Sequence, residues 1–118
     1  YTTFKYGKPT LSSNTMTNNE TISVSVDITN TGNYDADEIA QMYIRDLAAS
    51  VSRPVKELKG FERISIKKGE TKTVTFTITP EDLKFYNQEL EYKNEPGEFE
   101  VMVGPNSKDV QTLTFTLK

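Results

Sequence analysis

The acidic side chains are the first candidates for chemistry in this 118-residue sequence. Asp35, Asp37 and Glu38 fall together in the segment DADE, where carboxylate oxygens could bind a hard cation such as Ca²⁺. Their spacing is not that of a recognised calcium-binding loop, and the turn-forming residues Gly32 and Asn33 precede them. A solvated acidic turn is the favoured interpretation, and no metal site is predicted.

Glycoside hydrolysis is a second reaction that carboxylates perform, and it requires a pair of them about 5 Å or about 6.5–9.5 Å apart. Seven acids lie between residues 81 and 100: Glu81, Asp82, Glu89, Glu91, Glu95, Glu98 and Glu100. Glu98 and Glu100 alternate with apolar residues, so they fall on the outward face of a predicted strand. No pattern indicates a pocket that would shift their pKa values. Surface positions are favoured, and no catalytic residue is predicted.

The composition excludes several other kinds of site. The sequence contains no Cys and no His, so disulfides, thiolate or imidazole metal ligands and Ser-His or Cys-His nucleophile pairs are ruled out. The formal net charge of -3 argues against a nucleic-acid partner. No apolar run approaches the roughly 18 residues of a membrane span. The sequence therefore predicts no cofactor, no nucleic-acid partner and no membrane partner.

Charge is distributed unevenly along the chain. Residues 53–72 hold seven cations against three acids, whereas residues 81–100 hold seven acids against two lysines. A nucleic-acid patch is disfavoured, since the compensating acids are close in the sequence. Cross-strand pairing or a polar contact with another domain explains both blocks more simply.

Exposed aromatic rings offer a further possibility, because sugar-binding modules stack sugar rings on them. The sequence has no Trp, and Phe76, Phe99 and Phe115 fall in register with core aliphatic residues. Five tyrosines could be exposed: Tyr1, Tyr6, Tyr34, Tyr86 and Tyr92. A tyrosine platform for sugars stays open as an alternative, but core or rim positions are favoured and sugar binding is not expected.

Alternation of apolar and polar residues predicts the elements that hold these side chains. Strands are predicted at residues 21–30, 38–45, 60–66, 71–79, 98–103 and 113–117, with a short helical turn that Thr79 caps and Pro80 begins. The polar stretch 11–20 is predicted to be a loop. With about seven strands and no long helical period, the sequence predicts a single domain over residues 1–118. Its fold class is an all-β antiparallel sandwich, immunoglobulin-like or fibronectin type III-like.

Three motifs carry a resemblance to a known family. RPVKELKGFERI at 53–64, KKGETKTVTF at 67–76 and PGEFEVMVG at 96–104 occur in the order and spacing of the C-terminal fibronectin type III-like domain of family 3 glycoside hydrolases. These are the β-glucosidase and β-xylosidase type enzymes, and the opening YTTFKY is similar to the entry into that domain. The resemblance implies a C-terminal fragment of a larger, periplasmic or secreted enzyme.

The resemblance also implies that catalysis lies in upstream domains, which this domain packs on and supports. No catalytic residue of the family can be carried over to this chain. Arg53, Pro54, Lys56 and Lys59 are the candidate interface with those domains, since Pro54 favours an edge or crossover and the cations are expected to project outward. Phe61, helped by Leu58, is expected to anchor the following strand in the core.

Two alternatives stay open. The same cations can simply solvate an edge strand and block aggregation. The chain can also be a stand-alone carbohydrate-binding or adhesion module, because ITNTGNYDAD at 28–37 resembles a turn found in many bacterial sandwich domains.

Overall fold

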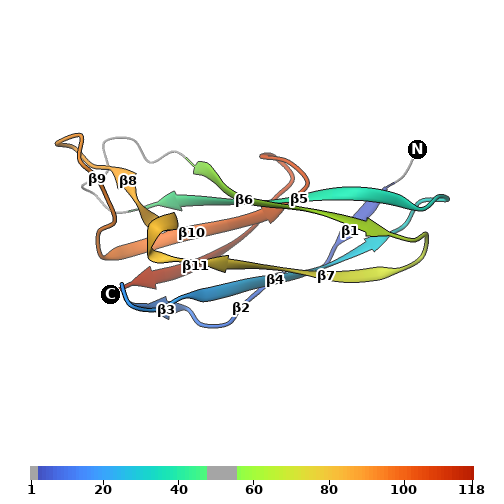
Figure 1. The fold of residues 1–118 in the computed structure, drawn as a ribbon, viewed down its shortest axis with the longest axis horizontal. Helices are drawn as coiled ribbons and strands as arrows, with labels where there is room; N and C mark the ends of the chain where they lie inside the picture. Colours follow the sequence, from blue (N-terminus) through green and yellow to red (C-terminus); the bar gives the residue numbers. More distant parts are fainter. Residues whose placement is uncertain (1–2, 48–55) are drawn as a thin grey trace.

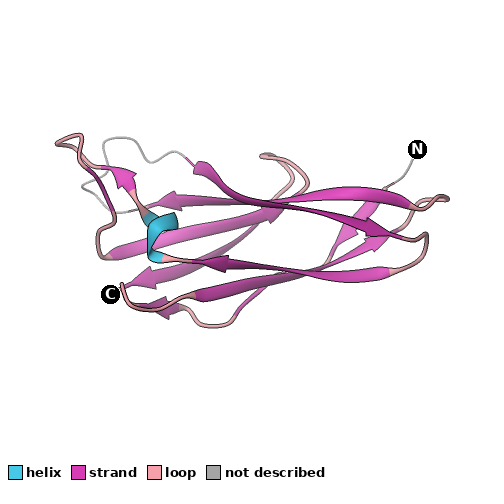
Figure 2. Cartoon of the chain, in the orientation of Figure 1, coloured by secondary structure: helices cyan, strands magenta, loops and turns pink. Residues whose placement is uncertain are grey.

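Antiparallel strands make up most of the protein, for which a computed structural model describes residues 3–47 and 56–118. Figures 1 and 2 show long strands running along the longest axis, with one helical turn at one end. The strands are β1 (Phe4–Tyr6), β2 (Thr10–Leu11), β3 (Thr15–Met16), β4 (Ile22–Asn30), β5 (Ala36–Asp46), β6 (Lys56–Ile66), β7 (Thr71–Ile78), β8 (Phe85–Tyr86), β9 (Tyr92–Lys93), β10 (Gly97–Gly104) and β11 (Gln111–Leu117). The helical turn η1 (Pro80–Leu83) follows β7.

Two sheets form the sandwich. In the first sheet, β4 pairs with β7 along one edge and with β1 and β2 along the other, all antiparallel. The second sheet has the order β3-β11-β10-β5-β6, in which β3 and β11 are parallel. The N-terminal segment therefore begins in the first sheet and ends in the second. The fold class predicted from the sequence is confirmed, with more strand segments than the seven expected.

The core lies between the two sheets, where the predicted alternation holds. Ile22, Val24, Val26 and Ile28 of β4 are at most 5% exposed. Burying such a side chain fully contributes about 1.5–3 kcal/mol relative to leaving it exposed. The three predicted core phenylalanines, Phe76, Phe99 and Phe115, are also buried. The rings of Phe99 and Phe115 stack with centroids 5.6 Å apart.

The helical turn η1 begins where the sequence predicted, with Thr79 at the N-cap position, and Asp82 accepts hydrogen bonds from Thr79. The Thr79 backbone N–H and hydroxyl donate to Asp82 Oδ2 over 2.9 and 3.0 Å, and Pro80 occupies the first position. The turn buries Leu83 completely. Within the described residues no helix is long and apolar enough to cross a membrane.

The loop predicted over residues 11–20 is wrong at Leu11, which ends β2, and at Thr15–Met16, which form β3. Met16 is 1% exposed and pairs with Leu117 at the other end of the chain. A two-residue strand has no periodicity of its own, and its partner lies about as far away in sequence as possible. Local patterning therefore misses it.

The expected core position of Phe61 is also wrong, and a β-bulge lies next to this residue in β6. Met42 pairs with Gly60, but its neighbour Tyr43 pairs with Leu58, so Lys59 is the extra residue. A bulge changes which residues of a strand face the core. Gly60 faces the core, and Phe61, on the face opposite Ile64 and Ile66, is 69% exposed instead of anchoring the strand. Leu58 is also 49% exposed.

Candidate functional site

The acids of the DADE segment hold strands together. Asp35 accepts the backbone N–H of Lys68 over 2.8 Å. Asp37 accepts hydrogen bonds from the Ser65 hydroxyl at 2.6 Å and from Arg63 Nε at 2.9 Å. The bond from Ser65, followed by that from Arg63, lowers the pKa of Asp37. The described residues contain no cluster of three or more acidic side chains that could hold a metal ion.

Glu38 has a different partner, the N-terminal strand β1. Its Oε2 accepts the Tyr6 hydroxyl over 3.0 Å. Burial, followed by the carboxylate of Glu38, raises the pKa of the Tyr6 phenol above its ordinary value. This hydrogen bond connects β1 of the first sheet with β5 of the second sheet.

A hollow of about 330 Å³ lies beside the DADE segment. Its lining includes Asp35, Asp37, Ser65, Lys67 and Lys72. Asp35 and Asp37 are engaged as described above, and Lys72 Nζ donates to the Ser65 carbonyl over 2.6 Å. These contacts tie the carboxylates and the ammonium that line the hollow to the neighbouring strands and turn.

The basic and acidic blocks of the sequence do not pair with each other in the described part of the chain. Six ion pairs occur there: Arg45–Glu100, Lys59–Glu57, Arg63–Asp37, Lys72–Glu70, Lys84–Glu81 and Lys93–Glu91. Two of them, Arg45–Glu100 and Arg63–Asp37, are cross-strand pairs of the second sheet. The others join residues close in the sequence.

The predicted interface residues fall into three groups. Arg53 and Pro54 lie outside the described residues, and their proposed role stays a prediction. Lys56 is exposed at the start of β6, where its Nζ lies 5.8 Å from the Tyr43 ring centroid and donates to the Ser107 carbonyl. It projects from the second sheet as expected.

Lys59 points the other way. Its side chain is 10% exposed, and its Nζ lies 4.7 Å from the ring centroid of buried Phe85. The ammonium also lies 3.3 Å from Glu57 Oε1 and 3.4 Å from the Lys84 carbonyl. The expected outward projection is therefore wrong for Lys59, because the bulge turns this residue towards the end of the core.

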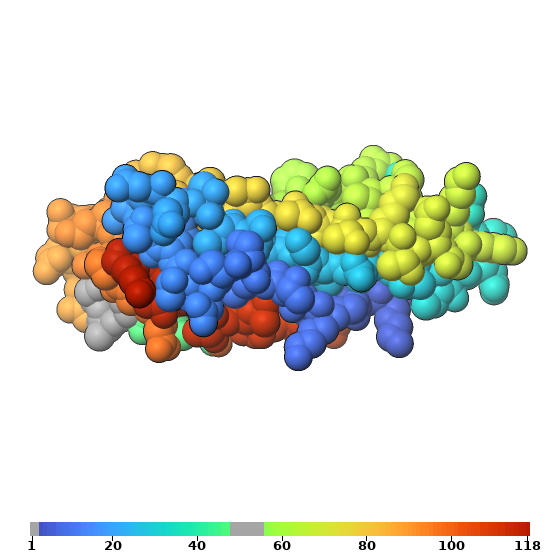
Figure 3. Space-filling view, turned by 90° about the horizontal axis from the view of Figure 1, so that it is seen from below, coloured from blue at the N-terminus to red at the C-terminus, as the bar shows by residue number. Residues whose placement is uncertain are grey.

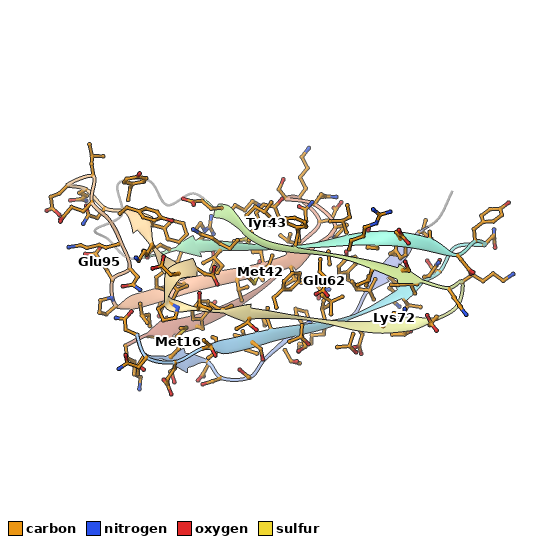
Figure 4. The ribbon with its side chains drawn as sticks, in the orientation of Figure 1. Met16, Met42, Tyr43, Glu62, Lys72 and Glu95 are labelled. Atoms are coloured by element: carbon orange, nitrogen blue, oxygen red, sulfur yellow. The ribbon has the colours of Figure 1, made fainter. Side chains whose placement is uncertain are left out.

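Apolar side chains gather on the outer face of the second sheet instead. Ile39 is 46% exposed, Leu58 49% and Phe61 69%. Register places Tyr43 opposite Leu58, and Gln41, between Ile39 and Tyr43, opposite Phe61. Figure 4 shows Tyr43 and the core residue Met42 on opposite sides of β5. We call Ile39, Tyr43, Leu58 and Phe61 the outer apolar patch.

The outer face of the first sheet has a different character. Figure 3, seen from below, shows this side with the N-terminal segment, β4 and β7 across it. Its cross-strand contacts are polar: Ser25 with Thr75 at 3.0 Å, Thr29 with Thr71 at 2.7 Å and Thr73 with Asp27. The sandwich therefore has one face of small polar side chains and one face with exposed large apolar ones.

The sequence pointed to the segment that contains the patch but not to the patch itself. Alternation in residues 60–66 does not show the bulge, because the bulge is defined by the pairing with β5. Ile39 carried the available signal, since the strand at 38–45 has apolar residues on both faces.

The chain is similar in sequence and in structure to parts of several known proteins. Residues 38–107 match the profile of the fibronectin type III-like domain family. A β-xylosidase from Formosa agariphila is 50% identical over the whole chain, and a periplasmic β-glucosidase from Salmonella typhimurium is 50% identical over 99% of it. The crystal structure of a β-glucosidase from Listeria innocua in complex with glucose aligns with a TM-score of 0.88 at 40% identity, over 99% of this chain.

This chain accounts for a small part of each of these proteins. It covers 17% of the Formosa protein, 15% of the Salmonella protein and 16% of the Listeria chain. The chain thus spans about one sixth of the length of the proteins that it matches.

Proposed function

The chain belongs to the family of fibronectin type III-like domains, and we propose that it is a non-catalytic accessory domain of a longer glycoside hydrolase. The longer enzyme is of the family 3 β-glucosidase or β-xylosidase type and hydrolyses terminal O-glycosidic bonds in carbohydrate metabolism. The chain packs on its catalytic domains and supports them. One observation carries this proposal: the whole chain is similar to one sixth of several such enzymes.

The hydrogen bonds that its carboxylates accept support a non-catalytic role for this chain. Asp35, Asp37 and Glu38 serve as acceptors between strands, and Glu100 accepts Arg45 Nε over 2.8 Å. Retaining hydrolysis needs a nucleophile and a general acid about 5 Å apart across the scissile bond. In our proposal the rest of the longer chain supplies both of these groups.

The longer enzyme is proposed to work in the periplasm or outside the cell. The Salmonella relative, which is named a periplasmic β-glucosidase, supports this location. Cell fractionation of the source organism, with a cytoplasmic marker enzyme as control, tests it.

The segment that begins β6 is proposed to contact the catalytic domains, with Arg53, Pro54 and Lys56 on the contact side. Lys59 contributes from within, because its contacts with Phe85 and Glu57 hold the bulge in place. Replacing Arg53 and Lys56 together by Ala is expected to weaken docking in the longer protein. The melting temperature of the 118-residue chain should stay near that of the wild type. Unchanged docking would refute the interface role of these cations.

The decisive experiment for the function begins with the coding DNA that flanks this sequence. We expect an open reading frame that continues into glycoside hydrolase domains. The purified longer product should release p-nitrophenol from the β-glucoside or β-xyloside, and the 118-residue chain should not. An open reading frame made of repeated sandwich domains would refute the proposal and favour an adhesion module.

A carbohydrate-binding module is the second candidate, since the rings of Tyr86 and Tyr92 are exposed with centroids 5.0 Å apart. Their planes are tilted by 49°, however, which does not form the flat platform that a sugar ring stacks on. Saturable quenching of tyrosine fluorescence by cello- or xylo-oligosaccharides would favour this candidate, and loss of the quenching in Tyr92→Ala would locate it.

A further inference from the structure

We propose that the outer apolar patch is the surface through which this domain docks onto the rest of the longer chain. The inference rests on the proposed function and adds a surface that the sequence-based interface did not include. It moves the centre of the contact from the cations at the start of β6 to Phe61 and Leu58.

Exposed apolar side chains distinguish the outer face of the second sheet from that of the first sheet. Phe61, Leu58 and Ile39 come from two paired strands and expose between 46% and 69% of their surface. The corresponding face of the other sheet carries Ser and Thr. Contiguous exposed apolar residues rimmed by polar ones mark interaction sites, whereas single exposed ones do not.

The backbone holds the two central residues in a fixed arrangement. Lys59 and Gly60 form the bulge opposite Met42, so Leu58 and Phe61 both point outward on either side of it. A Cβ on Gly60 would lie 3.3 Å from Phe76 Cδ1, so this position faces the core tightly. The bulged strand therefore holds the side chains of Leu58 and Phe61 at the surface in a fixed arrangement. Rigid presentation lowers the entropy lost on docking.

The charges around the patch are compatible with a contact that excludes water. Arg63 and Arg45 flank it, and each is already paired, with Asp37 and Glu100. Arg63 and Arg45 therefore would not be buried as unpaired charges when the surface is covered. Lys56 lies at the rim of the patch, where the residue is exposed and its ammonium is close to the Tyr43 ring. The matching surface is therefore apolar at its centre, with an acceptor facing Lys56.

The occupant is the remainder of the same polypeptide. The similar enzymes are about six times as long as this chain, so most of their mass lies outside the part that it matches. A surface in the same chain is present at a high effective concentration, and a patch of modest size then suffices for stable docking. A second copy of this chain is the competing occupant.

Side-chain footprinting by hydroxyl radicals tests the proposal in the 118-residue chain and in the longer gene product. Phe99, which is fully buried, and Tyr34, which is 65% exposed, serve as internal references. For each residue the oxidation rate in the longer protein is divided by that in the chain. The ratio for Phe61 and Leu58 should fall well below one, and the ratios for Tyr34 and Phe99 should stay near one. An unchanged ratio at Phe61 would overturn the proposal.

Substitution supplies the second readout. Phe61→Ser and Leu58→Ser should leave the melting temperature of the 118-residue chain unchanged within error, because both side chains lie at the surface. Each should lower the thermal inactivation temperature of the longer enzyme, and Tyr34→Ser, of similar exposure, should not. If Phe61→Ser and Tyr34→Ser behave alike in the longer enzyme, the patch is not the docking surface.

The outcomes separate this inference from the function on which it rests. A longer product that hydrolyses β-glycosides but leaves Phe61 as reactive as in the chain refutes the patch alone. A longer product without glycosidase domains refutes the proposed function. Concentration-dependent dimers of the chain that Phe61→Ser abolishes would assign the patch to a second copy and overturn the inference.

Discussion

The ammonium of Lys59 lies 4.7 Å from the ring centroid of Phe85, at the end of the hydrophobic core. A cation that the sequence places in a basic surface segment is thus packed on an aromatic ring, with 10% of its side chain exposed. Cation–π contacts are electrostatic, but the aliphatic stem of a lysine also covers apolar surface. These two contributions can be separated by substitution.

Lys59→Ala is expected to lower the free energy of unfolding by about 1–2 kcal/mol, because it removes both the stem and the ammonium over Phe85. Lys59→Met keeps most of the stem and should lower it by less. Urea denaturation of the 118-residue chain measures both. If Met is as damaging as Ala, the charge dominates; if neither has an effect, the contact with Phe85 is not stabilising.

Gly60 is the other residue of the bulge, and it tolerates little added volume. A Cβ there would meet Phe76 Cδ1 at 3.3 Å and Met42 Cε at 3.4 Å. Gly60→Ala is expected to destabilise the chain by about 1 kcal/mol, in the lower part of the range for overpacking. Combining it with Phe76→Leu should cost less than the sum of the two single substitutions, since the smaller side chain relieves the crowding. Strict additivity would contradict this explanation.

Asn87 supports the β8–β9 hairpin from a buried position. Its Oδ1 accepts the N–H groups of Glu89 and Glu91 over 2.9 and 3.0 Å, while Nδ2 has no partner among the described residues. Asn87→Ala should cost about 1–3 kcal/mol, because two backbone donors lose their acceptor. Asn87→Asp keeps the acceptor but buries a carboxylate charge at a position that is 1% exposed, so at neutral pH it should not restore the stability of the wild type. A loss in Asn87→Ala well below about 1 kcal/mol would show that the hydrogen bonds to Oδ1 contribute little.

The contrast between β4 and β6 shows which parts of this fold are predictable from the sequence. In β4 the alternation from Ile22 to Ile28 is uninterrupted, and burial of one face is a local consequence of the two-residue period. In β6 the bulge at Lys59 and Gly60 depends on pairing with β5, so the inward position of Lys59 could not be read from β6 alone. The exposure of Phe61 could be read from β6, because the two-residue period places it on the face opposite Ile64 and Ile66. The family motifs located the segment of interest, and the pairing between strands revealed that Lys59 faces inward.

The contribution of the Asp37 carboxylate to the free energy of unfolding should depend on pH. The Ser65 hydroxyl and Arg63 stabilise the ionised carboxylate, so its pKa in the folded state lies below the ordinary value of 3.8. Because the folded pKa is depressed, the stabilisation is complete above that ordinary value and is lost as the pH falls through the folded pKa. Asp37→Asn should therefore be less stable than the wild type at neutral pH, and the difference should shrink as the pH falls below about 3.8. Ser65→Ala removes the largest cause of the shift and should move the acid limb of the wild-type curve upward in pH. Urea denaturation between neutral pH and the acid limit measures all three proteins, and a difference that persists undiminished in acid would show that Asp37 does not act through its charge.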